Sequence, residues 1–244
     1  MNPKLEFGTQ SDGSVDLESC LVQVEASKAW FTRRILPLSI EQLLWRPEPW
    51  RWSIAECLDH LNATYRVWLP RVNAATSASS RLGHTLEGSP RYEGAEIEAL
   101  RLVEPPVVFR AVAPPDLIPA AAVDPDELVD YFCEFRDQYA ETLRRAFGLD
   151  LARILLTEPI APLIQSLGGA LAFLAAHERR HTWQSEQVRT APRFPKAAFA
   201  AEVQGEARLA AGEKSTRASK RGGDIGPAAN KTQREGDRGI ICGS

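Results

Sequence analysis

The chain has 244 residues, 44% of them hydrophobic, and a formal net charge of -3 at pH 7. This length and composition predict a globular protein with a full core, built either as one domain with appendages or as two domains. The small acidic charge gives no reason to expect nucleic acid or an anionic membrane as a main partner.

The ends of the chain and its cysteines indicate the compartment. Residues 1–14 lack a charged segment followed by an apolar one, so they do not resemble a secretion signal, and we expect a flexible N-terminus. Apolar residues 159–176 are interrupted by Pro, Gln, Ser and Gly, which favours a buried helix over a membrane span. The four cysteines are scattered without a CxxC pattern, as is typical of reduced thiols. We therefore expect a cytoplasmic protein.

The first two helices are predicted from apolar spacing and from capping residues. Over residues 15–36, apolar side chains recur near helical spacing until Pro37. A stretch rich in tryptophan and proline follows and leads to Ser53 and Glu56. A serine and a glutamate three residues apart can each accept a hydrogen bond from the other's free backbone N–H, which forms a capping box. The second helix is therefore predicted over residues 53–75.

The third helix is predicted to follow a long crossover. Residues 77–123 are interrupted by glycines and prolines and are too long for a simple turn, so we expect an ordered crossover with short pieces of structure. Asp124 then supplies an N-cap and Pro125 suits the first helical position. An apolar face follows, and the third helix is predicted over residues 125–147, with Gly148 as its stop.

The last helix and the tail complete the expected domain organisation. A short connection through two prolines leads to a fourth helix, predicted over residues 163–190. Residues 200–244 contain no aromatic residue and are rich in Gly, Ala and charged residues, a composition typical of disorder. We therefore expect a flexible segment over 1–14, a helical domain over 15–199 and a disordered tail over 200–244.

No segment alternates with a period of two residues, so the predicted fold class is all-α with four main helices. Short connections make the first and second helices antiparallel, and likewise the third and fourth. The long crossover allows the third helix to run parallel to the second. The predicted architecture is a four-helix bundle in the order up, down, down, up.

Three histidines on two of these helices carry the chemistry. His177 and His181 lie four residues apart, so they share a helix face with Cβ atoms about 5 to 6 Å apart, a span that one metal ion can bridge. If the second and fourth helices are antiparallel, His60 lies roughly 10 Å and His181 roughly 13 Å from the same end of the bundle. Three neutral imidazoles at one level can hold a divalent metal and leave coordination positions open. We treat His84 as a surface residue of the crossover.

Two further residues are candidates to act next to the metal ligands. Glu56 lies one turn before His60, from where it can reach the metal or orient the imidazole, although capping explains it as well. Gln184 lies one turn after His181, where its amide can bond a water molecule or a substrate, although helix packing explains it about as well. The catalytic residues stay unassigned.

Each of the remaining residues near the histidines has both a structural and a functional interpretation. Glu178 lies about 100° around the helix from His177, and its simplest interpretation is an ion pair with a neighbouring arginine. Arg179 and Arg180 are predicted to form a solvated face, or to bind an anionic substrate. Three tryptophans before the second helix can wall the metal pocket or seal the end of the bundle: Trp45, Trp50 and Trp52.

Together these motifs resemble the DinB/YfiT-like superfamily of metal-binding four-helix bundles. The segment LSIEQLLWRPEPWRWSIAECLDHL, the proline-rich crossover and AHERRHTWQSEQV carry the resemblance, which covers roughly residues 17–188. It implies a DinB-like domain over residues 15–199 and a histidine triad that maps onto His60, His177 and His181. It also implies a possible homodimer, and members with known activities include thiol-dependent S-transferases and hydrolases. The polar tail is not explained by the family.

Three functions fit these observations. The first is a metal-dependent enzyme, a thiol S-transferase or a hydrolase, that acts on a small-molecule substrate such as a low-molecular-weight thiol. The second is a non-catalytic metal-binding or stress-response module. The third takes HERRH as the HExxH motif of a metallopeptidase, with Glu178 as the base and Glu202 as a downstream ligand, and the upstream position of His60 disfavours it. The expected cofactor is a divalent transition metal, with Zn or Ni favoured and Fe, Mn or Co also suited to three histidines.

Overall fold

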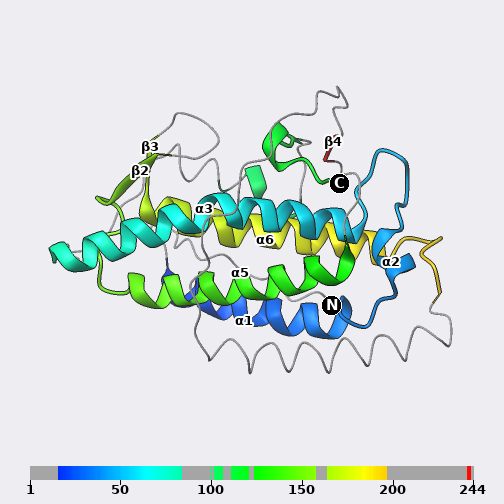
Figure 1. Cartoon of the computed structure of the whole chain (residues 1–244), viewed down its shortest axis with the longest axis horizontal. Helices are drawn as coiled ribbons and strands as arrows, with labels where there is room; N and C mark the ends of the chain where they lie inside the picture. Colours follow the sequence, from blue (N-terminus) through cyan, green and yellow to red (C-terminus); the bar gives the residue numbers. More distant parts are fainter. Residues whose placement is uncertain are drawn as a thin grey trace.

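Four long helices dominate the computed structural model, which describes residues 16–83, 100, 102–106, 111–120, 124–157, 164–196 and 241–242. They lie side by side (Figure 1) and are α1 (Leu17–Arg34), α3 (Ile54–Leu82), α5 (Pro125–Ala146) and α6 (Leu167–Arg189). A short helix α2 (Ile40–Leu44) and a 3-10 helix η1 (Pro115–Leu117) lie in the connections. The predicted all-α class is confirmed. No helix within the described ranges is both long enough and apolar enough to cross a membrane.

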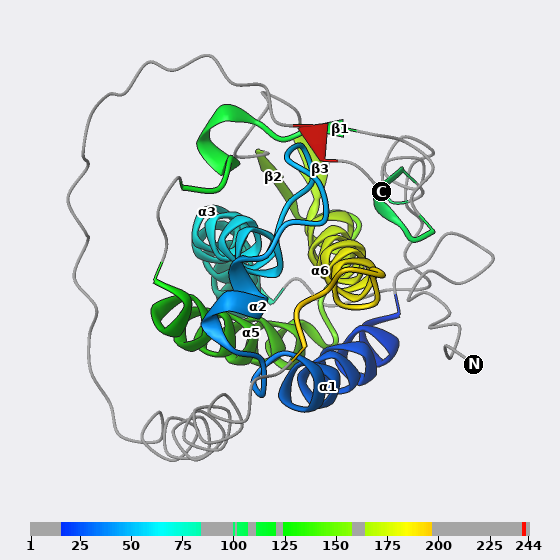
Figure 2. The ribbon, with the colours of Figure 1, turned by 90° about the vertical axis from the view of Figure 1, so that its right-hand side faces the viewer.

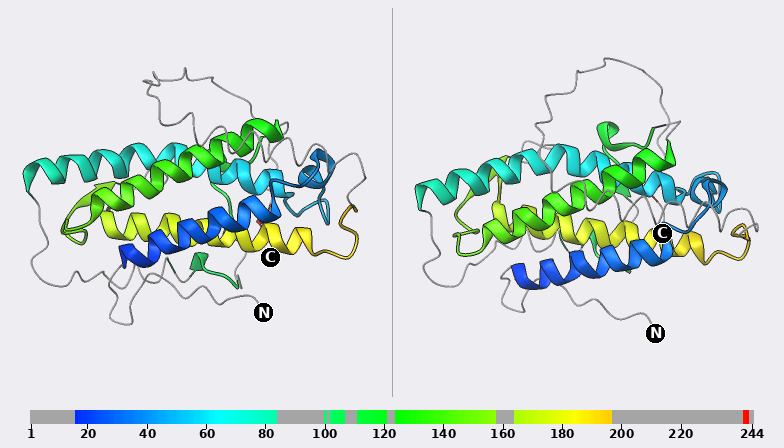
Figure 3. Two further views of the ribbon diagram at one scale, coloured as in Figure 1. Left: turned by 90° about the horizontal axis from the view of Figure 1, so that it is seen from below. Right: turned by 60° about the horizontal axis from the view of Figure 1, so that its bottom comes forward.

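The four long helices surround a common core. Seen along their axes, α3 packs on α5 and α6, and α1 packs on the same two helices from the other side (Figure 2). The view from below shows α1 beside α5 again (Figure 3). The sequence colours in Figure 1 show that α3 and α6 run in opposite directions. The first turns of α3 therefore lie beside the last turns of α6.

Capping residues explain where the long helices begin. Before each long helix, the side chain of one residue accepts a hydrogen bond from a backbone N–H of the first turn. These residues are Asp16 for α1, Ser53 for α3, Asp124 for α5 and Ser166 for α6. Because such residues are recognisable in a sequence, the predicted starts at Ser53 and after Asp124 are confirmed. Helix α6 begins four residues later than predicted, at Leu167.

Helix α3 is longer than predicted. It continues to Leu82 and ends at Gly83, which adopts φ +69°, a left-handed conformation that glycine accommodates without strain. Residues 76–82 contain no glycine or proline, and the hydroxyls of Thr76 and Ser80 donate to helix carbonyls one turn back. Polar residues that suggest a loop are thus accommodated within the helix, and the predicted end of the helix at residue 75 is wrong.

Short strands also occur where none were predicted. Strands β2 (Leu155–Thr157) and β3 (Ile164–Ser166) form an antiparallel pair just before α6, with Leu155 opposite Ser166. Strands β1 (Ala111–Val112) and β4 (Ile241–Cys242) pair in the same way. Each has only two or three residues, too few for a detectable alternation. Residues 1–14 and the rest of 200–244 lie outside the described residues, so the expected flexible N-terminus and disordered tail stay predictions.

Aromatic side chains fill the core between the helices. The rings of Phe31 in α1 and Phe132 in α5 lie 4.9 Å apart, and the buried guanidinium of Arg136 lies over both. Tyr65 and Trp68 of α3 are almost completely buried. Burial of large side chains of this kind contributes about 1.5 to 3 kcal/mol each to folding. The histidines therefore sit on helices that the core holds firmly in place.

Candidate metal centre

Helices α3 and α6 bring the three predicted histidines together. The Nε2 atom of His177 lies 3.1 Å from Nε2 of His60 and 3.1 Å from Nε2 of His181. One ligand atom from each residue lies within 4.8 Å of the other two. The three residues are 4%, 8% and 1% exposed for His60, His177 and His181. Side chains separated by more than a hundred positions in the sequence thus converge at one buried point.

The spacing of the nitrogen atoms fits a single metal ion. Two imidazole nitrogens that bind one ion at about 2.0 to 2.1 Å, with an angle of about 90 to 110° at the metal, lie about 2.9 to 3.4 Å apart. The two observed separations of 3.1 Å fall within that range. Three neutral nitrogen donors suit a divalent transition metal rather than Mg²⁺ or Ca²⁺, which prefer oxygen.

Hydrogen bonds on the far side of two rings turn their Nε2 atoms toward this point. Nδ1 of His60 lies 2.7 Å from the Leu117 carbonyl oxygen, and Nδ1 of His181 lies 2.9 Å from Oε1 of Gln184. Because these oxygens only accept, each Nδ1 carries the proton and donates it. The lone pair then resides on Nε2. Such bonds are the usual way in which proteins orient a histidine that ligates a metal.

The third ring, His177, is held by packing. It stacks on Phe173, with ring centres 5.3 Å apart and planes 15° apart. Its Nδ1 atom is buried and has no hydrogen-bond partner within the described part of the chain. The orientation of this ring therefore depends on ring contacts and on the two neighbouring histidines.

A buried tryptophan forms one wall of the cluster. The ring of Trp52 lies 5.0 Å from that of His60 and 5.9 Å from that of His181, measured between centres. Of the other two tryptophans, Trp45 packs edge-on against Phe194 and Trp50 is exposed. Trp52 thus forms a wall of the metal site, which was one of the two interpretations. Trp45 instead packs against the segment that follows α6.

Burial keeps the three imidazoles neutral. It lowers the pKa of His60 from 6.5 to about 4, and it lowers the pKa values of His177 and His181 well below the usual value. The nearby charge of Arg180 lowers all three pKa values further. At neutral pH each ring therefore has a free nitrogen lone pair, which metal binding requires.

The expectation that Arg179 and Arg180 form a solvated face is wrong. Both residues are buried, since the chain between α3 and α5 covers them. Arg179 donates two hydrogen bonds of 3.1 Å to the carboxylate of Glu104, and Arg180 donates to the Leu102 carbonyl at 3.2 Å. Burial raises the pKa of Glu104 to about 7, although the Arg179 guanidinium lowers it. The two arginines thus fix the crossover onto α6.

Glu178 has other partners than the predicted arginine. One of its carboxylate oxygens accepts from the hydroxyl of Ser27 in α1 and the other from the hydroxyl of Tyr65 in α3. The carboxylate is buried among these helices, and both of its oxygens are engaged. This arrangement disfavours Glu178 as the base of a metallopeptidase. Neither Ser27 nor Tyr65 was identified from the sequence, because a single hydroxyl on a core face gives no pattern.

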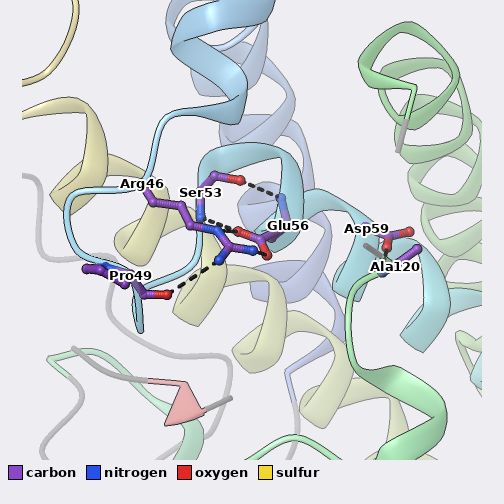
Figure 4. A network of polar contacts seen from close by, with 6 residues as sticks. All are labelled: Arg46, Pro49, Ser53, Glu56, Asp59 and Ala120. Atoms are coloured by element: carbon purple, nitrogen blue, oxygen red, sulfur yellow. Dashed lines mark hydrogen bonds and ion pairs between the residues drawn. The ribbon is translucent and has the colours of Figure 1, made fainter. Parts of the chain in front are cut away.

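Of the two candidates beside the ligands, Gln184 contacts a histidine and Glu56 contacts the cap of α3. The Glu56 carboxylate accepts from the Ser53 N–H at 2.9 Å and from the guanidinium of Arg46 (Figure 4). Arg46 also donates to the Pro49 carbonyl at 3.4 Å. These contacts correspond to the capping interpretation of Glu56 and give no support for a role next to His60.

Long packed helices with a buried three-histidine cluster define a class of helical proteins able to hold a metal. Comparison with protein families agrees: the model of the DinB superfamily matches residues 23–185. The chain belongs to the DinB superfamily. No curated protein and no solved structure matches it.

Proposed function

We propose that this chain is a metal-dependent enzyme of the thiol S-transferase or hydrolase type, with a divalent transition metal held by His60, His177 and His181. The observation that carries the proposal is the convergence of three buried Nε2 atoms at separations that one ion spans. Zn and Ni are the favoured metals, and Fe, Mn and Co also suit three imidazole ligands. The packing and directions of α1, α3, α5 and α6 support the up-down-down-up four-helix bundle that the connection lengths predict.

The charge around the cluster favours an anionic ligand. When bound, a divalent metal supplies Lewis acidity, which lowers the pKa of a water molecule or a thiol so that a nucleophile forms near neutral pH. The three imidazoles are neutral and Arg180 adds positive charge beside them. Among the described residues, no carboxylate belongs to the cluster. A thiolate or a hydroxide therefore suits the site better than a neutral ligand does.

The surrounding side chains exclude water from the imidazoles. Trp52 covers His60 and His181, and Phe173 covers His177. A low local dielectric strengthens the electrostatic effect of any charge held there. The chain's own contribution is thus to orient three donors, to keep them neutral and to supply the positive charge of Arg180.

The proposal includes a small-molecule substrate, a cytoplasmic location and a homodimer, with no nucleic-acid or membrane partner. Family resemblance supports the dimer and the low-molecular-weight thiol. The small net charge supports the absence of a nucleic-acid or membrane partner, and the scattered cysteines support the cytoplasmic location.

Elemental analysis of the full-length protein tests the metal site. We expect about one divalent ion per chain in the wild type and a large loss in His60→Ala, with unchanged helical content by circular dichroism. The fourth histidine of the chain, His84, lies outside the described residues and provides the matched control, since His84→Ala should keep the metal. Stoichiometric metal in His60→Ala would contradict the proposed ligand set.

Turnover tests the catalytic part of the proposal. Metal-loaded and metal-stripped protein are compared for conjugation of an electrophile to a panel of low-molecular-weight thiols, and for hydrolysis of small esters and amides. We expect activity only in the metal-loaded protein, lost again in His60→Ala. Metal binding without turnover in either assay would favour the non-catalytic module.

A further inference from the structure

The segment before α5 is attached to the start of α3 by two hydrogen bonds at adjacent residues. The Leu117 carbonyl accepts from Nδ1 of His60 at 2.7 Å. Three residues later, the N–H of Ala120 donates to Oδ2 of Asp59, also at 2.7 Å (Figure 4). One bond orients a candidate metal ligand, and the other fixes the chain that supplies the acceptor.

The acceptor lies on a piece of structure that does not hold itself in place. The 3-10 helix η1 has three residues, Pro115–Leu117, and no side chain caps its start. A single turn closes too few hydrogen bonds to be stable alone. The position of the Leu117 carbonyl must therefore be set by contacts with the rest of the protein.

Those contacts lie on both sides of the turn. Ala113 before the turn and Ile118 directly after it pack against Trp52 and Cys57 in a small apolar cluster, and the Leu117 side chain is buried. Apolar packing of this kind is not directional, so it leaves the rotation of a peptide group weakly determined. Two residues beyond Ile118, the Asp59 carboxylate holds Ala120 with a directional, charge-assisted hydrogen bond.

We propose that Asp59 is a positioning residue for the metal site: it fixes Ala120, and thereby the Leu117 carbonyl that orients the His60 imidazole. The inference rests on the proposed function, because its consequence is the alignment of a metal ligand. Asp59 acts through the crossover, since its bonded oxygen faces the N–H of Ala120. Without this bond the His60 N–H loses a fixed acceptor, so its ring samples other orientations.

Nuclear magnetic resonance of the metal-free full-length protein tests the link without any metal. The chain has only four histidines, so the spectrum of ¹⁵N-histidine-labelled protein is simple to assign. We expect His60 to be protonated at Nδ1 in the wild type and to average between tautomers in Asp59→Ala. Asp59→Asn retains a side-chain oxygen that can accept from Ala120 and should restore the wild-type signal.

A matched control separates this effect from a general loss of charge. Asp116 lies on η1 itself and is exposed, so Asp116→Ala removes a carboxylate close to the Leu117 carbonyl and should leave the His60 signal unchanged. An unchanged His60 tautomer in Asp59→Ala overturns the inference. A loss of the fixed His60 tautomer that is as large in Asp59→Asn as in Asp59→Ala also overturns it. The charge of Asp59, rather than its accepting oxygen, would then be responsible.

Metal affinity gives the second readout, by competition with a chelator for Zn²⁺ and by the visible spectrum of the Co²⁺ form. Loss of a group that orients a metal-ligating histidine weakens binding about 10 to 100-fold, and we expect about 10-fold for Asp59→Ala. Asp59→Asn and Asp116→Ala should stay within about 3-fold of the wild type. Wild-type affinity and spectrum in Asp59→Ala overturn the inference. A wild type that takes up neither ion overturns the proposed function instead, while the tautomer measurement still decides the role of Asp59.

Discussion

The three histidines of the cluster are oriented in three different ways. A backbone carbonyl holds His60, the side chain of Gln184 holds His181, and stacking on Phe173 holds His177. A carbonyl or an amide oxygen determines which nitrogen carries the proton, whereas stacking does not. The Nδ1 atom of His177 therefore has the least defined environment of the three rings.

The contacts of Glu178 distinguish the proposed metal site from the site of a metallopeptidase. It accepts from the hydroxyls of Ser27 and Tyr65 inside the core, so Glu178→Gln weakens two hydrogen bonds to a charged acceptor. Bonds to charged groups contribute about 1.5 to 3 kcal/mol each, and we expect the free energy of unfolding to fall by about that amount. Metal affinity should stay within about 3-fold because the carboxylate orients no ligand. Urea unfolding and chelator competition measure the two quantities.

Glu134 provides the control for that substitution. It is half-buried on α5 and accepts only from the Gln138 side chain among the described residues; Glu134→Gln keeps an accepting oxygen, so it should change neither stability nor metal affinity. A chelator-sensitive peptidase activity that Glu178→Gln abolishes would contradict our assignment and restore the role of this residue as a base.

At the scale of elements, the second half of α6 is unusual because polar residues are buried all around it. From His177 to His181 every residue is buried, and the side chains turn to different neighbours. Glu178 turns to α1 and α3, the arginines turn to the crossover, and the histidines turn to the start of α3. From its sequence a charged helical segment is expected to be solvated, but here α1, α3 and the crossover together make it part of the interior.

The capping box of α3 fixes the start of the helix that carries His60. The Ser53 hydroxyl accepts from the Glu56 N–H at 3.2 Å, so Ser53→Ala leaves one backbone donor of the first turn without this partner. We expect the free energy of unfolding to fall by about 1 kcal/mol, as is usual for a lost N-cap. Ser53→Thr keeps the acceptor and should keep most of the stability. Urea unfolding measures both variants, and an alanine variant as stable as the wild type would show that the cap contributes nothing.

At the scale of the whole molecule, local patterns predicted the helices well and the contacts between distant segments poorly. The helix predicted over residues 15–36 spans Leu17–Arg34, and the one predicted over 125–147 spans Pro125–Ala146, because caps and prolines mark their ends. His177 and His181 were identified by their spacing of four residues, and His60 by its similar distance from the same end of the bundle. Leu117, a backbone acceptor, and Glu104, a partner of Arg179, come from the irregular crossover, where no periodicity indicates which face a residue meets.

The buried histidines should make the stability of the metal-free protein depend on pH. In the unfolded chain they titrate near 6.5, whereas burial lowers the pKa of His60 to about 4 and the pKa values of His177 and His181 well below 6.5. Between these values the unfolded state binds more protons, so the free energy of unfolding decreases as pH falls, by up to about 1.4 kcal/mol per pH unit for each histidine.

Glu104 opposes this trend. Its pKa is raised from 4.5 to about 7, so between these values the folded state binds its proton more readily and gains stability as pH falls. The net slope between pH 6 and pH 5 should therefore approach that of about two protons rather than three. Urea unfolding of the metal-free protein at pH 7, 6 and 5 measures it, and His181→Leu should reduce the slope by about one proton because it removes one buried titrating ring. A stability that is constant from pH 7 to pH 5 would mean that the three rings remain accessible to protons in the folded protein, contrary to their burial.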